Sequence, residues 1–334
     1  HKGLIMAYTT IDKPSDYFNT KLYTGTGSEH AISGIGFAPN LVWLKCRSDA
    51  NNPMLFDTVR GATKNLYPNL TTAEGTEAQS LKSFDSDGYT LGTESDINGS
   101  SKTNVGWNWK AGTSFTNDAS STGVGSIDSA GSVNQDAGFS IIGYSGDTSD
   151  APSTVAHGLS QKPEMMFIKR RTLSGQWVVY NKTIGATHNL HLDSTDASSA
   201  YQYFFNNTEP TSSVFTVGDD GESNKTGSNY IAYCFHSVQG YSKIGSYTGN
   251  GNADGTFVYT GFKPAWLMVK RTDGTDYWYM YDNKRDVDNV IEHKLEANDS
   301  AAEYTSVDWL DFTSNGFKWR YTGGGVNASG GSFI

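Results

Sequence analysis

The amino-acid sequence predicts an all-β protein built from three repeated β-sandwich-like modules, of a jelly-roll or lectin-like kind, with little helix. Three observations predict this fold class: abundant turn residues, one pattern that recurs three times, and apolar runs of strand length. The 334 residues include 37 Gly and 8 Pro, which is typical of many short strands and unlike a helical bundle. Aromatic residues make up 13% of the chain, so it is not a disordered tail.

Each repeat opens with a turn and a buried strand. The turn is a Tyr-hydroxyl-Gly tripeptide, at residues 23–25, 144–146 and 247–249. A Pro, five mainly large apolar residues and a Lys follow, in the runs Pro39–Lys45, Pro163–Lys169 and Pro264–Lys270. Such a run is typical of a buried strand, and Pro is tolerated at its start because the first residue need not donate to the ladder. A second strand is predicted at 54–57, 177–181 and 278–282.

The second half of each repeat adds a corner and a further strand. Asp-Gly and Asn-Gly at the tips of 84–89 and 312–317 predict two-residue hairpin turns, because both central residues of that turn need positive φ. An Asn-x-Ser/Thr corner follows at Asn98, Asn224 and Asn327. Aromatic strands are predicted at 104–110 and 230–236, and the third repeat reaches Ile334 where its own copy would be under way. We therefore expect the gene product to extend beyond Ile334.

The repeats predict how the chain is divided. The predicted parts are an N-terminal segment at 1–14, modules at 15–112, 137–238 and 239–334, and a Gly/Ser-rich stretch at 113–136. Two interpretations of 113–136 are open: a flexible linker, or an exposed hairpin that meets a neighbouring subunit. Short helical turns are predicted near 72–82, 195–204 and 287–297.

Charge and cysteine content narrow the classes of function. There are 25 Lys and Arg against 35 Asp and Glu, a net charge of −10, and an acidic surface repels phosphate backbones and anionic lipid heads. No apolar run approaches the roughly 18–20 residues that a membrane-spanning helix needs. We expect no nucleic-acid partner and no membrane insertion. Cys46 and Cys234 are too few for a disulfide framework and are predicted to be small buried residues.

Two short motifs are weak candidates for metal binding. Asp85 and Asp87 fit part of an EF-hand loop, but an Asp-Gly hairpin explains the same residues. His188 and His191 have a spacing open to a metal, although the first repeat lacks both histidines at the matching positions. We expect no metal, no cofactor and no catalytic residues. The alternative is a glycosidase or depolymerase with two converging carboxylates, for which the densest acidic cluster is Asp282, Asp286, Asp288 and Glu292.

Aromatic residues near predicted loop edges are the candidate ligand-binding residues. Aromatic planes offer a flat apolar surface to the C–H faces of sugar rings. The candidates are Tyr201, Tyr203, Trp278, Trp309, Trp319 and Tyr321. The alternative is that they pack between strands, because large aromatic side chains are usually buried.

Long strings of the sequence resemble a domain family of tailed bacteriophages, prominent in phages of marine bacteria, whose members are tail-fibre or other virion proteins. The similar strings are MAYTTIDKPSDYFNTKLYTGTG, GFAPNLVWLKCR, LFDTVRGATKNLY, SFDSDGYTLG, VGWNWKAG, GYSKIGSYTGNGNADGTFVYTGFKPAWLMVKR and LDFTSNGFKWR. They cover nearly the whole chain. The resemblance implies a virion component that assembles in the host cytoplasm and is not an enzyme. It also implies a homo-oligomer, commonly a trimer, in contact with other virion proteins.

The expected function is host attachment by a tail fibre or appendage. Several weakly binding modules on several subunits would give high avidity for a glycan or protein on the bacterial surface. One rival is a purely structural virion protein, such as a capsid-decorating or connector protein. A second rival is a secreted bacterial lectin or surface-filament subunit.

Overall fold

The computed structural model describes residues 9–148 and 152–334, and it confirms the all-β fold class. Strands make up 39% of the chain and helix 5%. The predicted helical turns near 72–82, 195–204 and 287–297 are wrong, because these stretches hold bends and short strands. In the described residues, no helix has the length and apolar character needed to cross a membrane.

The first segment, residues 15–112, contains a four-stranded sheet in the order β1-β9-β3-β4. A three-stranded sheet, β2-β8-β7, and the short pair β5-β6 complete it. The elements are η1 (Pro14–Asp16), β1 (Phe18–Thr24), β2 (His30–Ser33), β3 (Leu41–Cys46), β4 (Met54–Asp57), β5 (Lys64–Asn65), β6 (Gly75–Thr76), β7 (Leu81–Asp85), β8 (Gly88–Leu91), α1 (Ser95–Asn98) and β9 (Thr103–Trp109).

The second segment, residues 137–238, shares one eight-stranded sheet with residues 113–136, in the order β10-β11-β12-β19-β14-β15-β16-β17. The stretch 113–136 forms β10 (Thr113–Asn117), α2 (Ala119–Thr122) and β11 (Ser129–Asn134), with β10 and β11 paired antiparallel. The remaining strands are β12 (Phe139–Ser145), β13 (Ser153–Ala156), β14 (Met165–Arg170), β15 (Val178–Asn181), β16 (His188–His191), β17 (Ser199–Ala200), β18 (Val214–Val217) and β19 (Asn229–Phe235).

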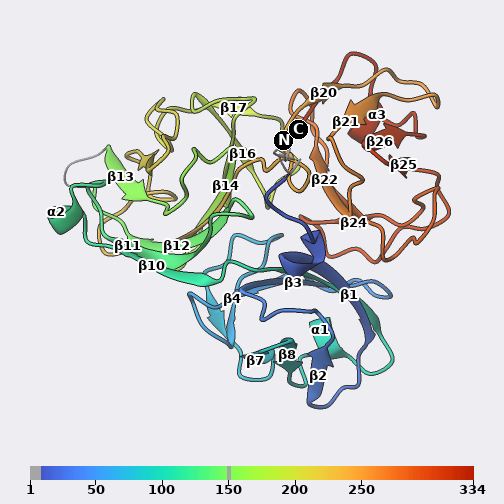
Figure 1. Cartoon of the computed structure of the whole chain (residues 1–334), viewed down its shortest axis with the longest axis horizontal. Helices are drawn as coiled ribbons and strands as arrows, with labels where there is room; N and C mark the ends of the chain where they lie inside the picture. The colour runs from blue at the N-terminus through green and yellow to red at the C-terminus, as the bar shows by residue number, and fades with distance from the viewer. Residues whose placement is uncertain (1–8, 149–151) are drawn as a thin grey trace, which may run out of the picture.

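The third segment, residues 239–334, has smaller sheets: β22-β23-β24, β21-β26-β25 and the pair β20-β27. Its elements are β20 (Tyr247–Thr248), β21 (Phe257–Tyr259), β22 (Trp266–Lys270), β23 (Trp278–Asp282), β24 (Leu295–Glu296), β25 (Leu310–Thr313), β26 (Gly316–Trp319), α3 (Gly324–Asn327) and β27 (Ser332–Phe333). In Figure 1 the three segments lie around a common centre, and each occupies its own side of the molecule. The division into three repeated modules stays a prediction, but matching contacts recur in all three segments.

The Tyr-hydroxyl-Gly turn and the Asn corner of each segment contact each other and form one structural motif. Tyr23, Tyr144 and Tyr247 each donate their hydroxyl to the carbonyl oxygen of the residue before the corner Asn, at 2.6–2.7 Å. The corner Asn donates to carbonyls of the loops around it, and its Oδ1 accepts a backbone N–H that follows the turn. The turn must contain Gly, because a Cβ on Gly25 would lie 2.2 Å from the Gly99 oxygen and one on Gly249 would lie 2.3 Å from the Ala328 oxygen.

The strands that follow the prolines are continuous apolar runs because both of their faces are buried. In β3, Leu41 and Trp43 face a central core shared by all three segments, while Val42 and Leu44 face a core inside the first segment. In β14, Phe167 faces the central core, and Met166 and Ile168 face the core of the second segment. This alternation between two cores explains why the sequence lacks the polar alternation of a half-exposed strand.

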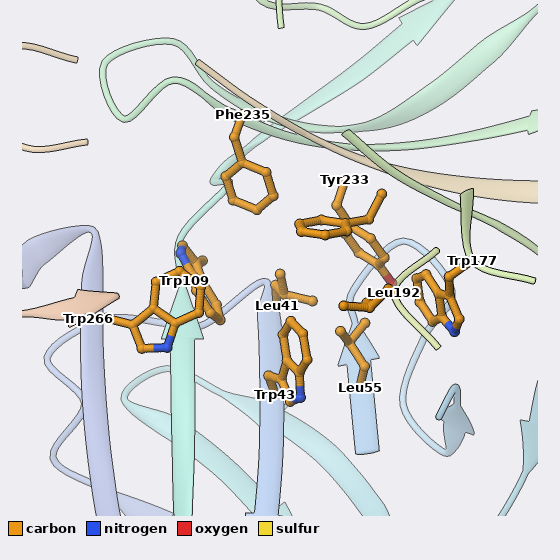
Figure 2. Close-up of a pocket in the computed structure, with 10 residues that line it drawn as sticks. Leu41, Trp43, Leu55, Trp109, Trp177, Leu192, Tyr233, Phe235 and Trp266 are labelled. Carbon is orange, nitrogen blue, oxygen red and sulfur yellow. The ribbon is translucent and has the colours of Figure 1, made fainter. Parts of the chain in front are cut away.

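The central core holds the three segments together. It includes Trp43 and Trp107 from the first, Trp177 and Tyr233 from the second, and Trp278 from the third, each at most 3% exposed. Figure 2 shows aromatic and leucine side chains of this core around an apolar cavity of about 20 Å³. The cavity is lined entirely by apolar and aromatic residues, so it is a packing gap in the centre of the molecule.

Candidate functional site

Two of the candidate ligand-binding residues lie on the surface, side by side. Tyr201 is 36% exposed and Tyr203 is 47% exposed, on the loop that follows β17. Their ring centroids are 5.3 Å apart and the rings meet at 65°. The buried ring of Phe204 supports Tyr201 from below at 4.6 Å. The pair therefore presents two solvent-facing aromatic surfaces on one short loop.

Backbone contacts hold this loop in place. The N–H of Tyr201 donates to Thr187 O at 3.1 Å, and the N–H of Asp220 donates to Tyr203 O at 3.2 Å. Gly218 lies directly beneath the loop, where a Cβ would lie 2.1 Å from Tyr203 O, so no other residue fits without moving the loop. The loop that carries the tyrosine pair is thus held in place, which lowers the conformational entropy lost when a ligand binds.

A carboxylate lies next to the pair. The Tyr201 hydroxyl donates to Asp220 Oδ2 at 2.8 Å, and Asp220 Oδ1 accepts the N–H of Glu222 at 2.7 Å. The hydrogen bond to Asp220 raises the pKa of Tyr201 to about 12, with burial and the charge of Asp220 adding to it. The hydroxyl therefore stays protonated at neutral pH. The site combines aromatic rings with a polar edge that both donates and accepts.

Three tryptophans on the candidate list are core residues, which corrects the expectation that they stack on a ligand. Trp278, Trp309 and Trp319 are 1%, 6% and 0% exposed. Trp278 Nε1 donates to His191 O at 2.9 Å, and Trp309 Nε1 donates to Glu292 O at 3.1 Å. Tyr321 is partly buried against Trp309, with ring centroids 4.5 Å apart. Large aromatic rings are usually buried, and here the rings pack in the core although they lie near predicted loop edges.

The weak metal candidates are engaged with protein groups. Asp87 accepts the N–H groups of Gly34 and Gly36, and these backbone hydrogen bonds lower the pKa of its carboxyl. Asp85 accepts the hydroxyls of Ser83 and Thr90. Among residues 9–148 and 152–334, no group of three or more His, Cys, Asp or Glu side chains is arranged to hold a metal ion.

The two histidines also contact their neighbours on β16. His188 Nδ1 lies 2.9 Å from Thr187 Oγ1, and His191 Nε2 lies 3.0 Å from Asn189 Nδ2. The second ring nitrogen of His191 lies 3.3 Å from Trp177 O. Both rings therefore have partners on β16 or on the residues that immediately precede β15 and β16.

The acidic cluster near residue 286 takes part in structural contacts. Asp282 is fully enclosed, ion-paired with Arg285 at 2.6 Å, and accepts the indole N–H of Trp107 at 3.0 Å. Burial raises the pKa of Asp282, but Arg285 and the hydrogen bonds outweigh it, so the pKa is lowered overall. Asp286 lies 2.5 Å from Nδ1 of His293.

Asp220 was missed by reasoning from the sequence. It lies 19 residues after Tyr201, and no spacing rule links the two, because the loops at 201–207 and 218–224 meet only in the folded chain. The sequence also did not predict that three lysines are buried and connect the segments. A Lys at the end of an apolar run predicts a strand end at the surface, because lysine is rarely buried. Lys45, Lys169 and Lys270 are each 0% exposed.

Comparison with known proteins adds one finding. The model of a family described as "Domain of unknown function (DUF7483)" matches residues 13–334, and the chain therefore belongs to this family. No curated protein and no solved structure matches the chain.

Proposed function

We propose that this member of the DUF7483 family is a bacteriophage virion protein of a tail fibre or appendage, and that it attaches the particle to glycans on the host surface. The observation that carries the proposal is the exposed pair Tyr201 and Tyr203 beside Asp220. The virion assignment is supported by the resemblance of its long strings to phage virion proteins.

The tyrosine pair suits a weak saccharide contact. A sugar ring packs its C–H face on one aromatic ring, and its hydroxyls bond with the Tyr201 hydroxyl and Asp220. A site of this size binds weakly on its own. Several subunits on one fibre, most simply a homotrimer, would multiply the contacts into useful avidity. The protein acts by binding, without a chemical step on the ligand.

Binding to whole host cells and to a glycan array tests this function. The double variant Tyr201→Ala/Tyr203→Ala is expected to lose at least tenfold in cell binding, because both stacking surfaces are removed. Tyr259→Ala is the matched control: Tyr259 is 62% exposed but lies on β21 in the third segment. Equal binding by the double variant and the wild type contradicts the proposal, and release of reducing sugar during the assay indicates a depolymerase instead.

A purely structural virion role is the second candidate, and one observation favours it. Strand β21 lies at the outer edge of its sheet and exposes Phe257 and Tyr259 on the same side, at 47% and 62%. An exposed strand edge with large apolar side chains is a suitable surface for another virion subunit. Under this role no host surface or glycan binds, and Tyr259→Asp blocks incorporation into particles.

A further inference from the structure

The hairpin β10–β11 sets the second segment apart. In the described part of the chain, β1 is the outermost strand of its sheet in the first segment, and β20 is outermost in the third. The matching strand in the second segment, β12, has β11 and β10 added beyond it. Figure 1 shows these strands along the side of the second segment that faces the first. Residues 113–134 therefore build a surface that the other two segments lack.

This hairpin forms one wall and the floor of a groove of about 540 Å³. The floor is a row of small residues across three strands, since Thr116 pairs with Ala130 and Ala130 pairs with Gly143. Val59 of the first segment closes the other side: a Cβ built on Gly143 would lie 3.6 Å from Val59 Cγ1. The groove is wide and open to solvent, so it would cover one face of a ligand.

The polar groups of the groove include both donors and acceptors. Asp128 Oδ1 accepts the N–H of Ala119 at 2.8 Å, and Asn229 Oδ1 accepts the Ser145 hydroxyl at 2.9 Å. Each of these side chains is exposed and keeps a second polar atom available. Asp118, at the same rim, accepts the hydroxyls of Ser120 and Ser121, which lower the pKa of its carboxyl. The groove therefore carries two carboxyl side chains, Asp118 and Asp128.

The guanidinium in the groove does not offset these charges. Arg171 is already paired with Glu74 of the first segment, at 2.8 Å and 3.0 Å. The groove is therefore acidic overall. It disfavours anionic ligands, while its mixed donors and acceptors suit hydroxyl groups, which also both donate and accept.

We propose that the groove between β10–β12 and Val59 is a saccharide-binding site that selects uncharged sugar chains over anionic ones. The small residues of the floor receive the flat face of the sugar, and Asp128, Asn229 and Ser145 bond to its hydroxyls. The choice of a saccharide rests on the proposed function, but the groove is a separate site from the tyrosine pair.

Backbone-amide NMR titration of the full chain tests the site directly. The probes are maltotetraose, cellotetraose, mannotetraose and chitotetraose as uncharged chains, with tetragalacturonate as the anionic chain. At least one uncharged chain is expected to shift the amide resonances of Ala130, Gly143 and Asn229 in a saturable way, and tetragalacturonate at least tenfold more weakly. The absence of such shifts with all four uncharged chains at millimolar concentration, or equal binding of tetragalacturonate, overturns the proposal.

Variants separate this groove from the tyrosine pair. Ala130→Leu fills the floor and is expected to weaken the groove titration at least tenfold. Ser114→Leu is the matched control, because Ser114 is an exposed neighbour on the same hairpin outside the lining. Asp128→Asn keeps the acceptor for Ala119 and is expected to weaken binding several-fold. Tyr201→Ala is expected to weaken cell binding and to leave the groove titration unchanged. Cell binding that does not depend on Tyr201 contradicts the role of the tyrosine pair alone. A groove that shows no saturable shifts while cell binding still depends on Tyr201 contradicts the groove proposal alone.

Discussion

Three buried asparagines show how one residue type is fixed by its surroundings. Asn98, Asn224 and Asn327 are each 0% exposed. A buried amide is tolerated only when its donors and acceptor are hydrogen-bonded. Here the side-chain amide of each Asn donates to backbone carbonyls of neighbouring loops and so links these loops. The Asn-x-Ser/Thr pattern at these positions is therefore a structural corner, and its carboxamides lie inside the protein, where no glycan has room to attach.

His157 is a second residue whose chemistry depends on burial. It is 0% exposed, its Nδ1 accepts the N–H of Leu159 at 3.1 Å, and its Nε2 lies 3.2 Å from Thr211 O. The network therefore places the proton of the neutral ring on Nε2. Burial, with a smaller contribution from the nearby His236, lowers the pKa of His157 to about 4.

We predict that His157 destabilises the fold at acidic pH. Its folded pKa lies below the unfolded value of about 6.5, so the unfolded chain takes up the proton first as the pH falls. Stability is then lost between about pH 6.5 and 4, by up to about 3 kcal/mol. Urea unfolding from pH 7.5 to 4.5 measures this loss. His157→Gln is expected to flatten that part of the profile, and an unchanged pH slope in the variant contradicts the prediction.

At the scale of the strands, the lysines that close the apolar runs connect neighbouring segments. Lys45 Nζ donates to Ser300 O at 2.8 Å, Lys169 Nζ to Thr71 O at 3.0 Å, and Lys270 Nζ to Thr195 O at 3.0 Å. Each lysine thus reaches a loop of another segment: first to third, second to first, and third to second. Burial lowers the pKa of all three to about 8, so they are largely charged at neutral pH.

Ion pairs follow the same cyclic order at two of the three junctions. At the junction of the second and first segments, Arg60 pairs with Asp57, and Tyr233 donates to Asp57 at 2.6 Å. At the junction of the first and third, Arg285 pairs with Asp282, and Trp107 donates to Asp282. The matching positions in the second segment are Asn181 and Ile184, so the third junction lacks this ion pair.

This natural difference gives a sharp mutational test. Arg60→Met leaves the enclosed carboxylate of Asp57 without its cation, and we predict a loss of about 3–5 kcal/mol in unfolding free energy. The double variant Asp57→Asn/Arg60→Ile copies the Asn and Ile of the third junction and is expected to recover at least half of that loss. Chemical denaturation of both variants measures the difference. A double variant less stable than Arg60→Met would show that the pair does not act as a unit.

At the scale of the whole molecule, the central core makes the segments depend on one another. Each segment has a core of its own, but its main sheet turns its other face to the shared core. Phe167, Trp177 and Tyr233 of the second segment are at most 7% exposed there. Separating the segments would expose these rings to water, at roughly 25 cal/mol per Å² of apolar surface.

We therefore predict that the chain unfolds as one cooperative unit. Calorimetry of residues 1–334 is expected to show a single transition whose calorimetric and van't Hoff enthalpies agree. The isolated fragment 113–238, which contains the second segment and its added hairpin, is expected to lack near-UV circular dichroism and to bind a hydrophobic dye. A fragment with a cooperative transition of its own would instead show that the segments are independent domains.

The sequence by itself determined the β class and most strands of this protein, because these depend on local properties. Turn residues and strand-length apolar runs predict β3, β14 and β22 at their observed places, and hairpins form at 84–89 and 312–317. The predicted turn type is wrong, because the two residues between the paired strands are Ser86–Asp87 and Ser314–Asn315, and none of them has a positive φ. Gly25 and Asn98 recur at matching positions of the repeats, so the sequence marks them as special. The sequence does not show which contacts they make.

Only the tertiary structure decided which candidate residues lie at the surface. Trp278 and Tyr201 look alike in the sequence, since both are aromatic residues near strand ends, yet one is 1% exposed and the other 36%. The difference arises from the packing of three segments around one core, which buries some strand ends and leaves others free. The contact of Tyr201 with Asp220, the buried lysines and the groove beside Val59 all join residues distant along the chain. Such contacts depend on how the sheets pack, which local sequence patterns do not encode.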